Sequence, residues 1–301
     1  MSISKIKISE EDKGKRLDIF LVEKHPDESR SYLQKQIKDG AVFVNGEKPS
    51  VHQFLKIGDE VKITKSQNHK NTKTKIPKYK LVFECDDYLI VEKPAGVLTH
   101  SDGIDLGLAD AIIKDYPEIK KVGNEDRWGI VHRLDKDVSG LLVVARTKKF
   151  FEYIKKQFSE RQIKKIYLAL VYGETPRDEE TLEFEIGRAE SGRMAARPID
   201  SGDKEAKTEI HVLKRFKNYT YLTVQIFTGR THQIRAHLLA YGHPVVGDNI
   251  YRLRRQRIKL PEGLKRLFLH SHQLGFTNIE GKFMEYKSNL PKELNEVLKN
   301  L

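Results

Sequence analysis

The chain has 301 residues, of which 38% are hydrophobic and 33% are charged. This length and apolar content suit a globular protein of about two domains and exclude a disordered chain. The 55 Lys and Arg residues outnumber the 43 Asp and Glu residues, which gives a formal net charge of +12. Such an excess favours polyanionic partners, nucleic acid ahead of an anionic membrane surface, although a solvated lysine-rich surface explains it equally well.

The cysteine content and the hydropathy pattern limit where the protein works. Cys85 is the only cysteine, so the sequence predicts neither a disulfide framework nor a cysteine-based zinc site. The first residues contain no apolar stretch typical of a signal peptide. The longest aliphatic run, roughly 141–145, is far too short to cross a bilayer. We therefore expect a soluble, cytoplasmic protein with no membrane partner.

Residues 1–64 have the pattern of a small module with two helices and a hairpin. Leu17, Phe20 and Leu21 have helical spacing, and a second helix from near Ser31 should stop at Gly40. The strand residues Val42 and Val44 lead into Asn45-Gly46, a hairpin signal, and a second strand is expected around 61–63.

Residues 65–80 differ sharply from what precedes them. This segment has six lysines and no acidic residue, a composition too polar to pack. It predicts a linker, either a solvated tether or a tether whose lysines also touch phosphates, and these two roles are compatible.

Residues 81–301 are rich in expected strands. Apolar runs and alternation predict strands at 81–85, 88–93, 140–146, 163–171, 182–186, 207–213 and 219–228. Helices are expected from the spacing of Phe150, Ile154 and Phe158, and from an N-cap at Thr231 to Gly242. Because the strands do not alternate strictly with helices, we predict an α+β fold, with a mixed, largely antiparallel central sheet and helices packed against it.

Two polar segments are candidates for chemistry. The run His132-Arg133-Leu134-Asp135 precedes an apolar strand, where functional side chains often gather, although an isolated run of this kind is more often a surface turn. The segment 228–235, TGRTHQIR, places cations at a helix N-terminus, which costs roughly 0.3–1 kcal/mol each. It predicts a negatively charged partner, either a carboxylate from elsewhere in the fold or a phosphate.

Metal and nucleotide chemistry have less support. The C-terminal half of the chain contains five of the eleven histidines in one region together with Asp248. These histidines are at positions 232, 237, 243, 270 and 272. His232 and His237 are five residues apart, so a helix would point them in directions about 140° apart. The sequence has neither a glycine-rich phosphate loop nor a dinucleotide motif. We therefore expect no metal, although a metal-dependent hydrolase stays an alternative that bound metal would reveal.

The ordered motifs together resemble the RluA family of pseudouridine synthases. The resemblance covers about 81–290 and includes five segments: 81–100, 132–146 with HRLDKDVSGLLVVAR, 157–173, 228–248 and 268–276. Residues 1–64, with RLD at 16–18 and VNG at 44–46, resemble the small RNA-binding domain that is often fused to such synthases and also occurs in a ribosomal protein. The resemblance implies the pseudouridine synthase fold for the catalytic domain.

The resemblance also implies roles for individual residues. Asp135 matches the catalytic aspartate, Tyr167 the tyrosine against the base, and Arg235 the arginine paired with the aspartate. Arg133 matches an arginine that displaces the target base, and we add Arg230, His232 and Gln233 of the TGRTHQIR segment as substrate-binding residues. One position departs from the pattern, because Val138 stands where the family usually has Thr, which changes local hydrogen bonding.

These features predict a cofactor-independent enzyme that isomerises uridine to pseudouridine in structured RNA. The reaction is redox-neutral, and Asp135 could act as nucleophile or base toward the ribose. Large-subunit ribosomal RNA is the expected substrate, with transfer RNA as the alternative, and we expect a monomer. The rival from another class is a non-catalytic RNA-binding or ribosome-assembly protein, which would have no use for a buried aspartate.

Overall fold

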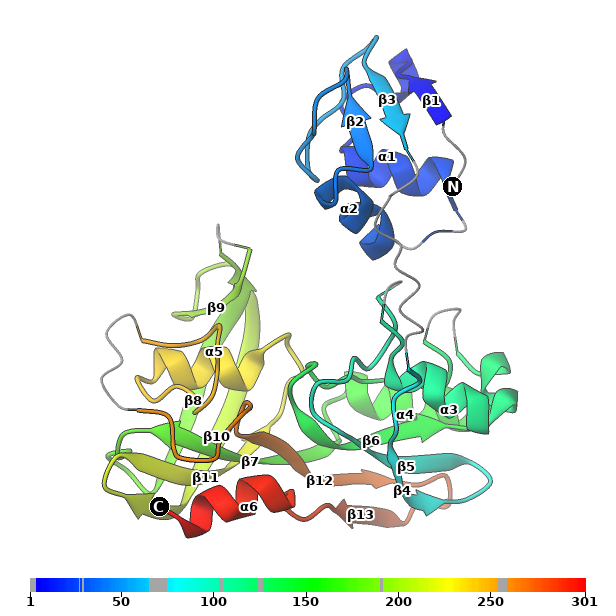
Figure 1. Cartoon of the computed structure of the whole chain (residues 1–301). Coiled ribbons are helices and arrows are strands. Elements are labelled where there is room, and N and C mark those ends of the chain that lie inside the picture. The colour runs from blue at the N-terminus through cyan, green and yellow to red at the C-terminus, as the bar shows by residue number, and fades with distance from the viewer. Residues whose placement is uncertain are drawn as a thin grey trace. The chain divides into compact units, whose positions relative to one another are not determined.

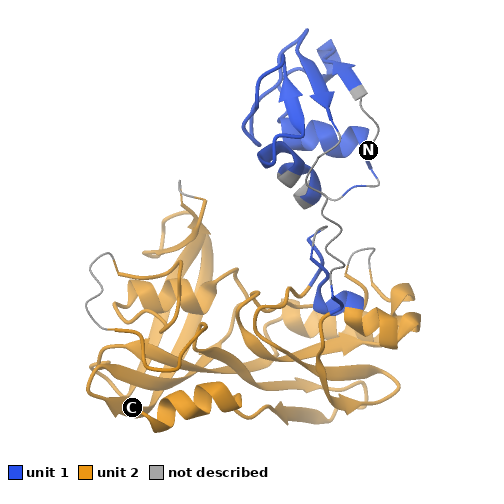
Figure 2. Cartoon of the chain, viewed as in Figure 1, with its two compact units in different colours: residues 1–76, 100–110 blue, residues 77–99, 111–301 orange. Residues whose placement is uncertain are grey.

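The computed structural model describes residues 4–26, 28, 30–64, 75–102, 105–123, 127–189, 192–253 and 259–301. The chain forms two compact units, shown in Figure 2. The first comprises residues 1–76 and 100–110, and the second comprises residues 77–99 and 111–301. Residues 65–74, which hold most of the expected lysine-rich linker, lie outside the described residues. None of the described helices is long and apolar enough to cross a membrane.

The N-terminal unit has the two helices and the strand pair that the sequence predicts, and one more strand. Its elements are β1 (Ser4–Lys7), η1 (Glu10–Asp12), α1 (Leu17–Lys24), α2 (Arg30–Lys38), β2 (Val42–Val44) and β3 (Glu60–Ile63). The strands pair antiparallel in the order β1-β3-β2. Apolar side chains of both helices, among them Leu17, Phe20 and Leu33, pack against Val61 and Ile63 of β3. The Asn45-Gly46 turn, with φ of 53° and 82°, returns the chain to Glu47 rather than directly to β3.

The second unit is built on a mixed sheet, largely antiparallel, as expected. Its strand order is β4-β5-β6-β12-β7-β11-β10-β8-β9, and β13 pairs with β12 (Figure 1). The pair β6 and β12 is parallel, and the other pairs are antiparallel. The strands are β4 (Lys80–Glu84), β5 (Tyr88–Lys93), β6 (Ser139–Ala145), β7 (Lys164–Tyr172), β8 (Glu179–Arg188), β9 (Met194–Arg197), β10 (Lys204–Phe216), β11 (Tyr219–Ile226), β12 (Leu269–Thr277) and β13 (Phe283–Lys287).

Helices cover both faces of this sheet, which buries its central strands. In Figure 1, α5 (Gln233–Ala240, yellow) lies above the sheet, and α6 (Lys292–Lys299, red) lies below it. Phe150 and Ile154 of α4 (Lys148–Ser159) pack with Leu141 and Val143 of β6. On the other side, Leu294 and Val297 of α6 pack with Phe268 and Leu170. The remaining helical elements are α3 (Leu108–Asp115) and η2 (Pro117–Lys121).

The start of α5 differs from the sequence prediction. Thr231 is not the N-cap, because the helix begins at Gln233 and His232 occupies the cap position. His232 has a left-handed backbone with φ of 56°, and its side chain makes no capping hydrogen bond. Its imidazole instead turns toward the pocket described below. At the other end, Gly242, with φ of 88°, follows the helix as predicted.

Candidate active site

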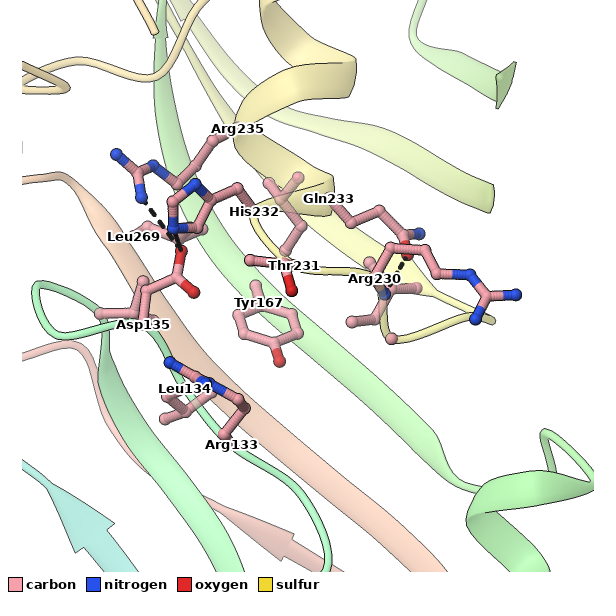
Figure 3. Close-up of a pocket in the computed structure, with 14 residues that line it drawn as sticks. Arg133, Leu134, Asp135, Tyr167, Arg230, Thr231, His232, Gln233, Arg235 and Leu269 are labelled. Atoms are coloured by element: carbon pink, nitrogen blue, oxygen red, sulfur yellow. Dashed lines mark hydrogen bonds and ion pairs between the residues drawn. The ribbon is translucent and has the colours of Figure 1, made fainter. Parts of the chain in front are cut away.

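The seven residues that the sequence singles out all line one pocket between β6, β7 and α5. These are Arg133, Asp135, Tyr167, Arg230, His232, Gln233 and Arg235. Figure 3 shows Asp135 and Arg235 facing one another at one end, with Tyr167 in the middle and Arg230 at the other end. Residues from distant parts of the chain therefore meet at one place, and apolar side chains such as Val138, Ile226 and Leu269 complete the walls.

The loop that carries Asp135 is held in place by the turn after β5. Thr99 is buried, and its hydroxyl donates to the Leu134 carbonyl at 2.8 Å and accepts from the Leu134 amide at 3.2 Å. The Gly96 amide donates to the Lys136 carbonyl at 2.8 Å. Hydrogen bonds therefore fix the backbone on both sides of Asp135.

Lys93 adds a third tie between the same two segments. Its side chain is completely buried, and its ammonium group donates to the carbonyls of Pro94, Val97 and Lys136 at 2.9, 2.7 and 3.0 Å. Burial lowers the pKa of Lys93 to about 7, although the charges of Asp137 and Asp135 oppose this shift. Three carbonyl acceptors satisfy all the donors of an ammonium group, so Lys93 cross-links the turn to the Asp135 loop.

Asp135 and Arg235 make direct contact, and Arg235 is in turn held by Asp248. The Nη1 of Arg235 lies 3.1 Å from Oδ2 of Asp135. Its Nε and Nη2 donate to the two carboxylate oxygens of Asp248 at 2.6 and 2.9 Å, a bidentate pair. Burial alone would lower the pKa of Arg235, but hydrogen bonds and charges from Asp248 and Asp135 outweigh it and raise the pKa. The guanidinium group is therefore a fixed positive charge beside Asp135.

His232 approaches Asp135 from the left-handed start of α5. Its Nε2 lies 3.7 Å from Oδ2 of Asp135, and its Nδ1 lies 3.0 Å from the Tyr251 hydroxyl. Burial lowers the pKa of His232, an effect that the Asp135 charge opposes and the Arg235 charge reinforces. The ring therefore faces Asp135 in its neutral form near pH 7.

Tyr167 projects from β7 into the centre of the pocket and is 7% exposed. Burial raises the pKa of its hydroxyl, and the negative charge of Asp135 raises it further. The phenol therefore stays protonated at physiological pH and offers a flat ring with a hydroxyl group, not a phenolate base.

The other three expected residues differ in how freely they can reach a ligand. Arg133 is exposed, and no hydrogen bond or ion pair joins its guanidinium group to any described residue. Arg230 donates to the Glu205 carbonyl at 3.2 Å but stays partly exposed. Gln233 is buried, and its amide group is fully engaged: Oε1 accepts from Thr228 and from the Arg230 amide, and Nε2 donates to Lys207 and Thr208.

The histidines that suggested a metal site do not come together. Within the described part of the chain, no group of three or more His, Cys, Asp or Glu side chains is arranged to hold a metal ion. His270 is buried between Ser139 and Ser288, at 2.9 and 3.1 Å, and His237 is buried against Phe184. His243 and His272 contact backbone carbonyls of Tyr172 and Ser288. These side chains serve the fold.

Comparison with known proteins places this pocket in a family. The model of the RNA pseudouridylate synthase family matches residues 87–240, and the S4 domain model matches residues 15–61. The chain belongs to the RNA pseudouridylate synthase family. The family match covers Asp135, Tyr167 and Arg235, and it confirms the resemblance that the motifs suggested.

Relatives and solved structures agree with this assignment. The chain is 34% identical to the uncharacterized RNA pseudouridine synthase YlyB of Bacillus subtilis, over 98% of this chain and 97% of that protein. It is 36% identical to ribosomal large subunit pseudouridine synthase D of Neisseria meningitidis serogroup B, over 95% of this chain and 78% of that one. The human RNA pseudouridylate synthase domain containing 1 protein has a similar structure, with a TM-score of 0.57 and 28% identity over 70% of this chain and 83% of that chain.

Three residues hold the pocket residues in place, although the sequence did not predict this role for them: Asp248, Lys93 and Thr99. Asp248 ends the segment 228–248 that carried the family resemblance. Lys93 begins the turn Lys93-Pro94-Ala95-Gly96 in the segment 81–100, and Thr99 follows that turn. None of them carries a spacing signal, because each acts through a contact with a distant loop or helix.

Proposed function

We propose that Asp135 is the catalytic carboxylate of this pseudouridine synthase. The observation that carries the proposal is the ion pair between Asp135 and Arg235, beside the ring of Tyr167. The pair orients one carboxylate oxygen, Oδ2, and leaves Oδ1 without a hydrogen bond to any described residue. Asp135 is the only carboxylate that lines the pocket among the described residues.

The proposed reaction moves the bond between ribose and base from one atom of the uracil to another. The C1′–N1 bond of uridine must break, the uracil must turn, and C5 must bond to C1′. C5 then loses its proton and N1 takes one up. An ionised carboxylate near the ribose acts as nucleophile or base in this sequence. Arg235 orients the Asp135 carboxylate and places a fixed positive charge beside it. No step requires an electron acceptor or a metal ion.

Tyr167, Arg133 and Arg230 bind the nucleotide in this proposal. The Tyr167 ring lies where a planar base would pack, and its protonated hydroxyl can donate to a carbonyl of the base. The target base must leave its stack, which costs a few kcal/mol. Arg133 is exposed and makes no hydrogen bond or ion pair with the described residues, so it can occupy the space that the base leaves. We assign His232 and Gln233 to positioning roles, because both are engaged with protein groups.

The proposed substrate is large-subunit ribosomal RNA. This rests on relatives named ribosomal large subunit pseudouridine synthase D, such as the Neisseria meningitidis protein. The net charge of +12 and the S4 domain at residues 15–61 fit a polyanionic RNA partner. In the domain arrangement that we propose, residues 1–64 bind RNA, 65–80 form a basic linker, and 81–301 carry the catalytic pocket, in a monomeric protein.

The Asp135→Asn variant tests the proposed role of Asp135, because it keeps the volume of the side chain and removes its charge. RNA from cells that lack the gene, labelled with tritium at C5 of uridine, serves as substrate. We expect the variant to bind this RNA as the wild type does and to release no tritium above background. Substantial release by Asp135→Asn would show that another group is the catalyst.

A further inference from the structure

Lys165 is a buried cation beside the pocket, and the proposed mechanism assigns it no role. It lies on β7, two residues before Tyr167, and is 8% exposed. Its ammonium group has one hydrogen bond, a long contact of 3.5 Å to the Thr228 carbonyl. No carboxylate pairs with it among the described residues. A buried lysine in a native structure is normally paired, because an unpaired buried charge is costly.

The surroundings of Lys165 do not explain its charge. Its Nζ lies 5.8 Å from the centre of the Phe158 ring, which is a weak partner. The nearby His132 ring accepts a hydrogen bond from the Val143 amide at 3.0 Å, so its Nε2 carries no proton. Burial first, and the Lys165 charge second, lower the pKa of His132 to about 3. The neighbours of the ammonium group are therefore neutral or apolar, and burial lowers the pKa of Lys165 to about 8.

The backbone directs Lys165 toward the same pocket as Tyr167. Alternate residues of a strand lie on the same face of a sheet, about 6.5 Å apart. The side chains of Lys165 and Tyr167 are buried, whereas those of Lys164 and Ile166 are only partly buried. Lys165 is not itself among the residues that line the pocket, but its ammonium group adjoins Gly229, which is one of them. A Cβ added at Gly229 would lie 4.0 Å from the ammonium group, which among the described residues is the nearest heavy atom outside residues 228–230. No side chain of residue 229 therefore separates the charge from a base held against Tyr167.

We infer that Lys165 stabilises the negative charge that uracil acquires when its bond to the ribose breaks. The inference rests on the proposed function. When C1′–N1 breaks, the electron pair of the bond passes to the uracil, which spreads the charge over N1, O2 and O4. Formation of the C5–C1′ bond returns an electron pair from the base to C1′ and so removes that charge. The C5 proton is then lost and N1 takes up a proton, so the base is anionic only between the two bond changes. A fixed cation in a pocket of low dielectric favours such a transient anion strongly.

A backbone phosphate is the other anion that could approach a lysine, but the structure favours the base. A phosphate of RNA binds to solvent-exposed lysines, as a flexible contact without fixed geometry. Lys165 is only 8% exposed, and the pocket that it adjoins is the one lined by Tyr167. The two roles make different predictions, because phosphate binding acts on affinity and anion stabilisation acts on turnover.

The test compares Lys165→Met with Lys164→Met, two changes at neighbouring positions of β7. Lys164 lies on the other face of the sheet and pairs with Glu285 at 3.0 Å, so its loss should leave turnover unchanged. Full-length proteins are assayed in single turnover with saturating large-subunit ribosomal RNA transcript, and the loss of the uridine N-glycoside is followed by nuclease digestion and chromatography. We expect Lys165→Met to turn over about 10- to 100-fold more slowly with unchanged RNA affinity. Lys165→Arg, which keeps the charge, should recover part of the rate.

A transcript made with 5-fluorouridine separates the inference from a merely structural role. Fluorine at C5 makes the departing base a more stable anion, so cleavage of the N-glycoside needs less help from a cation. We expect the cleavage defect of Lys165→Met to shrink on the fluorinated transcript, whereas a distorted pocket would slow both transcripts equally. An equal defect on both, or a loss of affinity and salt dependence with intact turnover, would overturn the inference. Asp135→Asn, run alongside, reports separately on the proposed catalyst.

Discussion

Arg235 and Asp248 form a bidentate ion pair at 2.6 and 2.9 Å, with the Asp248 carboxylate wholly inaccessible to solvent. Asp248 Oδ1 also accepts from the backbone amides of Ile250 and Tyr251 at 2.8 and 2.9 Å. The carboxylate is thus anchored to the backbone, and it holds the guanidinium group so that one nitrogen, Nη1, is left to face Asp135. The Tyr251 ring packs 4.9 Å from the guanidinium carbon and limits its rotation further.

Asp248→Asn should therefore impair catalysis through Arg235. The change leaves the buried Arg235 charge without its bidentate partner, which destabilises a protein by about 3–5 kcal/mol. We expect a lower unfolding temperature and a fall in kcat much larger than the fall in RNA affinity, because Nη1 loses its fixed direction toward Asp135. Tritium release at saturating RNA and thermal unfolding measure the two effects.

Asp178→Asn is the matched control for this prediction. Asp178 also pairs with an arginine, Arg215, but its side chain is 81% exposed. An exposed pair contributes at most about 1 kcal/mol, so both kcat and the unfolding temperature should change little. If Asp248→Asn behaved like Asp178→Asn, Arg235 would hold its orientation through other groups.

Local sequence signals predicted much of the fold, and the reason lies in periodicity. The apolar alternation of β11 and the 150, 154, 158 spacing of α4 are patterns that burial imposes on a single segment. The strand β1 escaped prediction because its four residues, Ser4–Lys7, gain their stability by pairing with β3. The Thr231 N-cap prediction was wrong because Gln233 and the left-handed His232 organise the start of α5 instead.

The candidate site depended on the family resemblance more than on local patterns. Asp135 and Arg235 are 100 residues apart, and no periodicity relates them. The cations of TGRTHQIR did indicate a negatively charged partner, and Arg235 has two. They could not indicate Asp248, because that ion pair depends on how the loop after α5 returns to β7 through the bridge between Val171 and Val245.

His237 should make the stability of the catalytic unit sensitive to mild acid. Its ring is fully buried, and neither nitrogen has a hydrogen-bond partner among the described residues. Burial lowers its pKa from 6.5 to about 4. The unfolded chain therefore takes up a proton at a higher pH than the folded chain does, and stability is lost as the pH falls from about 6.5 to about 4. The loss in the free energy of unfolding that is due to His237 is at most about 3 kcal/mol.

His237→Leu is expected to remove this part of the acid sensitivity. Leucine fills a similar volume without burying unpaired polar atoms, so the variant should be at least as stable as the wild type at pH 7. Urea unfolding at pH 7, 6 and 5 gives the free energy of unfolding, and the gap between the two proteins should widen as the pH falls. Parallel curves for His237→Leu would show that His237 does not titrate in this range.

Removal of residues 1–76 should weaken RNA binding and spare the catalytic pocket. The ten-stranded sheet begins at Lys80, and the apolar clusters around Phe150 and Phe268 use residues beyond that point. The chain 77–301 should therefore fold and show native circular dichroism. It lacks the S4 domain and lysines such as Lys65, Lys70 and Lys73. For a duplex-like polyanion, the slope of log affinity against log salt becomes shallower by about 0.9 for every phosphate that is no longer neutralised.

Binding and tritium release over a salt series, on full-length and shortened protein, separate docking from catalysis. We expect the shortened protein to bind more weakly, with a shallower salt dependence, and to keep its turnover at saturating RNA. Equal affinity and slope would show that residues 1–76 do not dock RNA. A folded protein without turnover would instead show that the first unit contributes to the reaction itself. Residues 100–110 stay in the shortened protein although they group with the first unit, so native circular dichroism must be established before turnover is compared.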